Sequence, residues 1–283
     1  MNSRIFTLAL RRLRSRPGLT VLSLLSVVLA VGMVASIPIF SQGVSYLLLR
    51  EELLALGKFY HRPPLTTRLY FVAKENTPLS LEEAQTLGES FRDLIVGRTG
   101  LPAAQTATYV GSPSLTLQST TGDSRYPETD KGVIREGLSL SVVTDIGNHI
   151  TIVEGEPFGQ LAQARVSAWV YEELSTQLGL QVGENYEMVS QRTGGQVPIT
   201  IAGIWREADL EDFYWSGTTV LWRDALLVSE DDYKAAVEPN FPQKTGFTAW
   251  YIVPDDADLS LARADAAAAG LKLAPSLADL IFP

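Results

Sequence analysis

Residues 17–49 read PGLTVLSLLSVVLAVGMVASIPIFSQGVSYLLL, and none of these 33 side chains is charged. The apolar part, residues 19–40, would form a helix about 33 Å long at 1.5 Å per residue. This length matches the hydrocarbon core of a bilayer, which is roughly 30 Å thick. Five arginines precede the stretch, and the first acidic residue is Glu51. Because arginine-rich flanks are retained in the cytoplasm, we expect a cytoplasmic N-terminus and an extracytoplasmic remainder at a cell membrane.

A cleavable signal peptide is the alternative, because it also has a basic start and an apolar middle. Small residues at Ala30 and Gly32, or at Ala35 and Ser36, are compatible with cleavage. However, the apolar run is longer than the usual roughly 7–15 residues of a signal peptide. The chain also stays leucine-rich through residues 47–49. We therefore favour a retained anchor.

The sequence predicts four parts: a cytoplasmic amphipathic elbow (1–17), a transmembrane helix (18–41), a helical stalk (42–60) and an extracytoplasmic domain (61–283). In the elbow, apolar residues fall near one face and arginines on the other. Topology marking alone would explain the arginines. Contact with lipid headgroups or a cytoplasmic partner is a second, compatible interpretation, and its candidates are Arg11, Arg12, Arg14 and Arg16. The candidate stalk residues are Val44, Leu47, Leu48 and Leu54.

The charge and cysteine content restrict the function classes open to the outer part. Residues 51–283 carry 17 Lys and Arg against all 32 Asp and Glu, a net charge of −15. A surface this acidic repels nucleic acid, so we expect no nucleic-acid partner. The absence of cysteine excludes disulfides, thiol nucleophiles and thiolate metal sites.

Two similar segments at the ends of the outer domain indicate an α+β fold. Residues 70–72 form a β-like run that precedes a helical pattern after Ser80, and residues 250–253 precede another after Ser260. The first helix is expected to reach about Ile95, and the second to cover 262–269. We expect the two strand–helix units to pair with each other around a long insertion.

The predicted insertion, about residues 130–235, is rich in short β signals punctuated by glycine. A helix is expected over 171–178, ending at Gly179, and a hairpin turn at Gly194-Gly195. Residues 112–131, rich in Ser, Thr, Gly and Asp, are expected to form a mobile loop. The predicted strands are 138–143, 149–153, 166–170, 186–190, 198–204 and 218–221.

Signatures of catalysis or of ligand binding are missing. His61 and His149, the two histidines, lack the spacing of a zinc site, and no Walker A loop or serine-hydrolase motif occurs. We therefore expect no catalytic residue, cofactor or metal. The aromatic run Phe213, Tyr214 and Trp215 has two interpretations: packing in the core, or an exposed patch that contacts a partner.

Several segments together resemble one family. Leu8–Pro17 followed by Leu19–Leu22 resembles the start of the first transmembrane helix of FtsX/MacB-like ABC transporter permeases. Val153–Phe158 resembles the G-x-x-F turn of the family. Gly179–Gly183 and the closing strand Ile201–Ile204 follow in the same order as in the MacB-like periplasmic core.

The resemblance implies a non-catalytic permease subunit that couples a separate cytoplasmic ABC ATPase to its outer domain. It also implies contact with membrane lipid and a permease dimer. Family members carry further transmembrane helices after this domain, so we expect a fragment of a larger permease or a truncated single-pass derivative. Two alternatives remain: a single-pass anchored binding or sensor module without an ATPase, and a secreted hydrolase that has lost its signal.

Overall fold

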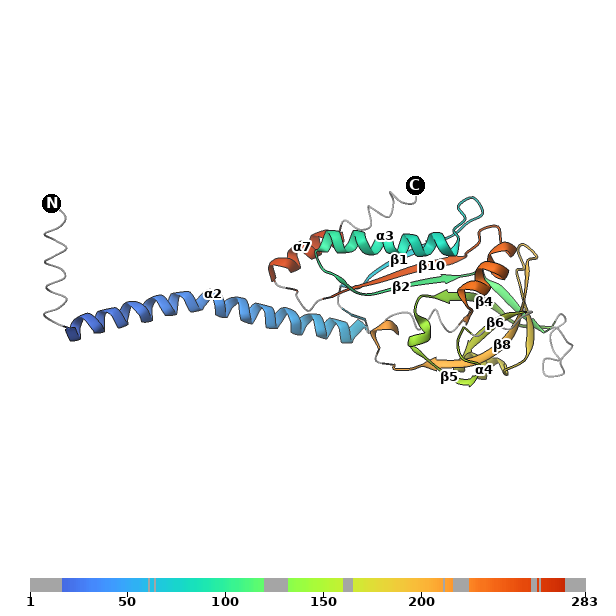
Figure 1. Ribbon diagram of the computed structural model, residues 1–283, viewed down its shortest axis with the longest axis horizontal. Helices are drawn as coiled ribbons and strands as arrows, with labels where there is room; N and C mark the ends of the chain where they lie inside the picture. The colour runs from blue at the N-terminus through green and yellow to red at the C-terminus, as the bar shows by residue number, and fades with distance from the viewer. Residues whose placement is uncertain are drawn as a thin grey trace. The chain divides into compact units, whose positions relative to one another are not determined.

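A computed structural model describes residues 17–60, 62–63, 65–119, 132–159, 165–210, 212–215, 224–255, 259 and 261–272 (Figure 1). The protein is α+β, with one long apolar N-terminal helix followed by a domain rich in β-sheet, as predicted. The chain divides into two compact units, Met1–Leu53 and Leu54–Pro283.

The N-terminal helix, α2, runs without interruption over Pro17–Tyr60 and contains Pro38. Two of its serine hydroxyl groups bond within the helix: Ser26 donates to the carbonyl of Leu22 at 2.9 Å, and Ser36 to that of Met33 at 2.8 Å. Among the described residues, α2 is the one helix long and apolar enough to cross a membrane. A signal sequence near an N-terminus can be equally long and apolar, so length and composition alone do not distinguish the two.

The second unit contains ten strands and several helices among the described residues. Its longer elements are β1 (Thr67–Val72), α3 (Leu81–Thr99), β2 (Ala103–Gly111), β3 (Leu115–Ser119), β4 (Val133–Val143), β5 (Ile150–Gly155), β6 (Val166–Tyr171), α4 (Glu172–Leu178), β7 (Asn185–Val189), β8 (Gln196–Glu207), β9 (Ala225–Leu227), β10 (Phe247–Pro254) and α7 (Leu261–Lys272). Short helical turns cover Ile146–Asn148 and Phe213–Trp215. A further short helix, α6 (Glu230–Asp232), continues into the helical turns Tyr233–Val237 and Glu238–Asn240.

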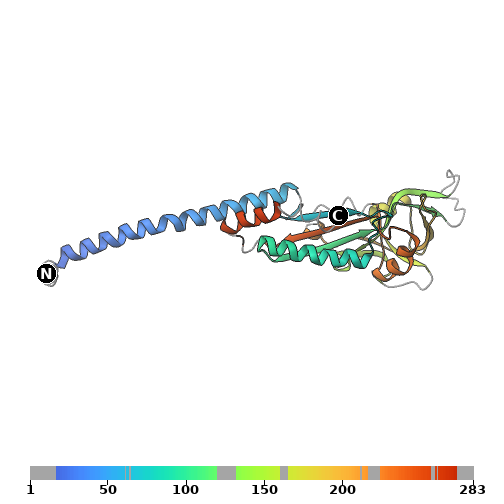
Figure 2. The same cartoon turned by 90° about the horizontal axis from the view of Figure 1, so that it is seen from above.

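The first and last strands lie side by side, as the sequence predicted. β1 pairs with β10 in antiparallel register, with Tyr70 opposite Ala249, and β10 pairs with β2 on its other side. Helix α3 runs alongside these three strands in both views (Figures 1 and 2). The expected pairing of the first and last strands is therefore confirmed.

Helix α3 begins at the expected residue. Ser80 and Glu83 form a capping box, in which the side chain of each accepts a hydrogen bond from the backbone N–H of the other. The helix runs past the predicted end to Thr99 and closes on Gly100, whose φ of 68° suits glycine. Helix α7 contacts α3, and Gly270 lies so close to the backbone of Arg98 that a Cβ would not fit.

Six of the remaining strands, β4, β3, β7, β8, β6 and β9, close into a barrel, and β5 pairs with β8 outside this path. Among the described residues, the sheet order continues β2-β4-β3-β7-β8-β6-β9, and β9 pairs back onto β4. Closure leaves these strands without a free edge. The core of the barrel takes side chains from alternate residues of its strands, as period-2 geometry requires: Leu115, Leu117, Leu138, Leu140, Val166, Ala168, Val170, Tyr186, Met188, Val197, Ile199, Ile201 and Leu226.

Strand β4 belongs to both parts of the domain. Its first half pairs with β3, while residues 139–141 pair with β9 and residues 141–143 pair with β2. Strand β8 is similarly long and pairs in turn with β7, β6 and β5. These two strands therefore connect the barrel to the rest of the sheet through continuous backbone.

Most of the secondary-structure elements predicted within residues 130–235 are present in the structure. Five predicted strands overlap β4, β5, β6, β7 and β8, and the sixth, 218–221, lies outside the described residues. Helix α4 ends at Gly179, and the hairpin turn lies at Gly194-Gly195. The loop predicted over 112–131 is wrong in part, because β3 occupies Leu115–Ser119. Leu115 and Leu117 are buried in the barrel, which offsets the polar composition of the segment.

The G-x-x-F segment forms a turn with a definite packing role. Gly155 has a φ of 96°, and a Cβ there would collide with the backbone of Ala202. Phe158 then packs edge-on against Trp169, with ring centroids 4.9 Å apart. The indole N–H of Trp169 donates to the carbonyl of Glu156 at 2.9 Å, which fixes the turn against β6.

Candidate functional site

The elbow and stalk residues are only partly described. Arg11, Arg12, Arg14 and Arg16 lie outside the described residues, so their contact with lipid or with a partner stays a prediction. On α2, the stalk candidates Val44, Leu47, Leu48 and Leu54 are exposed. Exposed apolar side chains along one helix are typical of a surface that contacts lipid or other helices. The stalk role itself also stays a prediction.

The aromatic run is buried in the domain. Tyr214 is 6% and Trp215 3% exposed, so these two side chains form no exposed patch. Trp215 stacks on Trp205 with ring centroids 5.8 Å apart, and the hydroxyl of Tyr214 donates to the carbonyl of Thr144 at 2.8 Å. The core-packing interpretation therefore describes this pair. The side chain of Phe213 lies outside the described part, and partner contact through the run stays a prediction.

His149 ties this aromatic cluster to the turn after β4. Its ring lies flat on Tyr214, with centroids 3.7 Å apart and an interplanar angle of 5°. Its Nδ1 is 2.6 Å from a carboxylate oxygen of Asp212, and Nε2 is 3.7 Å from Asp145. Burial raises the pKa of the Tyr214 phenol, so the phenol remains a neutral donor. The arrangement holds the 212–215 segment in place.

No cluster of three or more His, Asp or Glu side chains is placed to hold a metal ion in the part of the chain that the structure describes.

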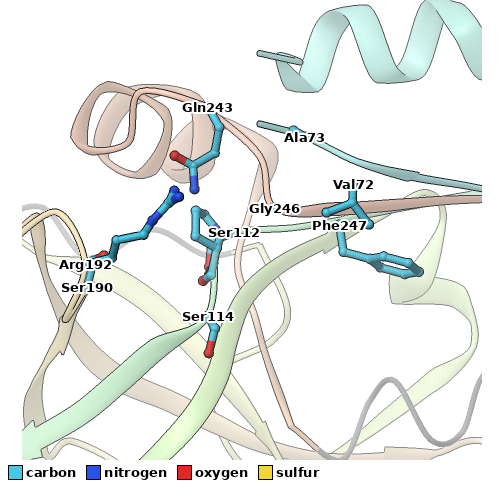
Figure 3. Close-up of a pocket in the computed structure, with 10 residues that line it drawn as sticks. Val72, Ala73, Ser112, Ser114, Ser190, Arg192, Gln243, Gly246 and Phe247 are labelled. Carbon is cyan, nitrogen blue, oxygen red and sulfur yellow. Dashed lines mark hydrogen bonds between the residues drawn. The ribbon is translucent and has the colours of Figure 1, made fainter. Parts of the chain in front are cut away.

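A cavity of about 370 Å³ lies where the three-stranded part of the sheet meets the barrel (Figure 3). One wall is apolar and comes from Val72 of β1 and Phe247 of β10, which are opposite each other in the strand register. Phe247 stacks on Tyr70 at 5.6 Å, and Tyr70 is 54% exposed. The apolar wall therefore continues onto an exposed aromatic ring.

The opposite wall of the cavity is polar. Arg192 comes from the β7–β8 turn and Gln243 from the loop before β10, and Figure 3 shows their side chains directed toward each other. The guanidinium of Arg192 lies 3.5 Å from the carboxylate of Glu75, and both side chains are more than half exposed. Gln243 is only 4% exposed, and its Oε1 has no hydrogen-bond partner.

Backbone hydrogen bonds make the floor of the cavity rigid. Gly246 donates to the carbonyl of Gly111 at 2.8 Å and accepts from Ala73 at 2.9 Å. A Cβ on Gly246 would lie 2.7 Å from the Cα of Pro113, so only glycine allows this close approach. Ser112 is buried there, and its hydroxyl accepts from Leu140 at 3.0 Å.

Sequence reasoning missed the residues of this cavity. Arg192 lies in a polar turn, where a basic side chain is usually solvated, and Gln243 follows a proline in a loop. Neither belongs to a motif with fixed spacing. The cavity forms only because strand pairing brings together segments that are distant in the chain, with Val72 opposite Phe247 and Thr116 opposite Val189.

Comparisons with known proteins give remote structural matches only, of which one is described here. No family model matches the chain, and no curated protein matches it. A crystallised domain of a protein described as a permease from Porphyromonas gingivalis is similar at 10% sequence identity and a TM-score of 0.32. The match covers 56% of this chain and 65% of that domain. Nothing about function follows from similarity at this level.

Proposed function

We propose that this chain is the N-terminal portion of an ABC transporter permease subunit of the FtsX/MacB-like type. It has no catalytic role of its own. ATP hydrolysis takes place on a separate cytoplasmic chain, and the resulting movement passes through the elbow and α2 into the outer domain. The outcome is export of a substrate or activation of an extracytoplasmic partner.

The observation that carries this proposal is the length and continuity of α2. Its 44 residues correspond to about 66 Å of helix at 1.5 Å per residue. That is about twice the thickness of a bilayer's hydrocarbon core. A helix of this length crosses the membrane and still extends well beyond it, which a simple anchor does not require.

The connection from α2 to the sheet is short and hydrogen-bonded. Six residues separate the end of the helix at Tyr60 from β1 at Thr67. Within them, the N–H of Arg62 donates to the carbonyl of Gly57 at 3.1 Å, and the hydroxyl of Thr66 donates to Pro63 at 2.7 Å. A connection of this kind favours transmission of movement over free pivoting.

The sequence supports the remaining parts of the proposal. The basic N-terminal segment favours a cytoplasmic N-terminus with lipid headgroups or the ATPase as its contacts. The acidic outer domain, with a net charge of −15 over residues 51–283, disfavours contact with anionic lipid or nucleic acid. A permease dimer, expected from the family resemblance, belongs to the same proposal.

Single-cysteine variants test the membrane topology. Since the chain contains no cysteine, a thiol reagent reacts in this chain only with the introduced residue. In intact cells, a membrane-impermeant maleimide should label Lys58→Cys and should leave Arg14→Cys unlabelled until the membrane is permeabilised. Labelling of Arg14→Cys in intact cells would refute the proposed orientation. Release of a mature protein that lacks the Arg14 position would instead identify a cleaved signal.

Crosslinking tests the coupling to an ATPase. A photo-reactive maleimide on Arg12→Cys should crosslink to a protein that carries a Walker A motif, whereas the same reagent on Lys58→Cys should not. Sequencing of the DNA after the Pro283 codon provides an independent test, and an open frame encoding further apolar spans supports a permease. A chain that forms no crosslink to an ATPase and whose frame encodes no further spans would contradict the proposal and favour an anchored sensor module.

A further inference from the structure

We propose that the cavity between β1, the β2–β3 turn and the β7–β8 turn binds the carboxylate end of an N-acylated apolar amino acid. Such a group occurs in a free N-acyl amino acid and at the C-terminus of a peptide. This site is independent of the permease proposal, because it rests on the geometry of the outer domain alone.

Arg192 supplies the charge that a carboxylate requires. Among the described residues that line the cavity, it carries the one positive charge, and none of them is acidic. Its ion pair with Glu75, at 3.5 Å and largely exposed, is of a kind that contributes little to stability. A ligand carboxylate that accepts two parallel N–H bonds from the guanidinium would therefore displace Glu75.

Gln243 supplies a hydrogen-bond donor and a hydrogen-bond acceptor beside the guanidinium of Arg192. Its backbone is fixed, since its carbonyl accepts from Leu79 at 3.2 Å and from Thr245 at 2.7 Å. A buried amide oxygen that lacks a donor is destabilising, so the site favours a ligand that brings an N–H. The terminal torsion of glutamine is soft, which allows the amide to turn its oxygen to the ligand N–H and its NH₂ to the carboxylate.

The apolar wall explains why the ligand carries an apolar side chain. Val72 and Phe247 lie side by side across β1 and β10, and Pro113 lines the cavity near them. The volume of about 370 Å³ is at the small end of the usual range for ligand pockets, roughly 300–1,000 Å³. It suits one bulky residue with its carboxylate and acyl group.

The charge of the outer domain restricts the ligand to a single negative charge. With a net charge of −15 over residues 51–283, the domain repels polyanions such as polyphosphates. A monocarboxylate held by one arginine within a preorganised cavity is compatible with this field. Capture of a terminal carboxylate is a known mode of peptide recognition.

The test is isothermal titration of the full chain in detergent with N-acetyl-L-phenylalanine, and with its neutral amide as the matched ligand. We expect the acid to bind with a Kd of about 1 mM or tighter, and the amide to bind at least tenfold more weakly, as loss of a charge-assisted pair implies. Arg192→Gln should weaken binding of the acid about tenfold. Arg92→Gln, which removes a similarly exposed ion-paired arginine from α3, should leave it unchanged.

A second variant tests the displacement of Glu75. Glu75→Gln should tighten binding of the acid, because the guanidinium no longer has a competing carboxylate. Both positions are exposed, so neither variant should affect folding, and far-ultraviolet circular dichroism provides that control. Titration with acetyl-Ala-Ala-Phe, as the acid and as the amide, distinguishes a peptide C-terminus from a free N-acyl amino acid as the source of the carboxylate. Tighter binding of the peptide acid indicates a peptide C-terminus, and tighter binding of the single residue indicates a free N-acyl amino acid.

Three results would overturn the assignment. The first is no detectable heat of binding for either acid up to about 10 mM. The second is equal affinity for the acid and its amide, which would show that the carboxylate is not recognised. The third is unchanged affinity in Arg192→Gln, which would place the bound acid elsewhere on the protein.

Discussion

The indole N–H of Trp250 in β10 donates a hydrogen bond of 2.7 Å to the carbonyl of Ala84 in α3, across 166 residues of sequence. The same indole packs edge-on against Phe91, with ring centroids 5.1 Å apart. One buried side chain from the end of the domain therefore fixes the helix that begins it. This contact anchors the two strand–helix units to each other.

Gly88 makes that close approach possible. A Cβ on Gly88 would lie 2.7 Å from the hydroxyl of Thr108 and 2.8 Å from the ring of Trp250. We expect Gly88→Ala to lower the free energy of unfolding by about 1–3 kcal/mol, because this overpacks the interface. Gly97→Ala, in the same helix with nothing near its Cβ, should instead raise it by about 0.5–1 kcal/mol. Urea denaturation compares the two, and equal effects would contradict this account of Gly88.

The N-terminus of α3 is stabilised by its capping box. Ser80→Ala should lower the free energy of unfolding by about 0.5–2 kcal/mol, because the N–H of Glu83 loses its acceptor. Ser90→Ala is the matched control in the same helix, where the serine is exposed and alanine has the higher helix propensity. Chemical denaturation should show no loss of stability for Ser90→Ala. A similar loss in both variants would exclude a specific capping effect.

The capping box also predicts a dependence on acid pH. The hydrogen bonds from the backbone and side chain of Ser80 lower the pKa of Glu83 below its ordinary value of 4.5. A lowered pKa in the folded state means that this stabilisation is present above pH 4.5 and is lost as the pH falls through the folded-state value. Glu83→Gln should flatten this part of the curve of unfolding midpoint against pH. An unchanged curve would show that Glu83 does not contribute to it.

Buried tyrosines predict the behaviour of the domain at alkaline pH. Burial raises the pKa of Tyr109 and Tyr233 above the ordinary value of 10.0. Stability from a raised pKa is fully present below pH 10 and is lost as the pH rises toward the folded-state value. Phenolate absorbance should therefore show a group of tyrosines that ionises only with alkaline unfolding. In denaturant, all 10 tyrosines should titrate together, and an identical titration of the native protein would contradict their burial.

Local chemistry was readable from the sequence. The capping pattern at Ser80, the glycine that ends α4 and the double glycine of the β7–β8 hairpin all depend on neighbours within a few residues. The pairing of β1 with β10 was also predictable, because two similar units at opposite ends of a domain have few other partners.

Closure of the barrel was not predictable, because it depends on contacts between distant segments. β9 has only three residues, yet it pairs with both β4 and β6, and no periodicity can be read from so short a run. β3 was hidden in a polar segment, where two leucines were too few to indicate a strand. The cavity has the same origin, since Arg192 and Gln243 meet only after the strands have paired.

Strand β4 has a consequence for how the domain unfolds. Since one continuous backbone supplies hydrogen bonds to the barrel through β3 and β9 and to the flanking strands through β2, neither part can lose its order alone. The sheet-rich domain should therefore melt as one cooperative transition in calorimetry, with the calorimetric and van't Hoff enthalpies equal. Such cooperativity means that a force applied to β1 at one edge of the sheet is resisted by the entire domain.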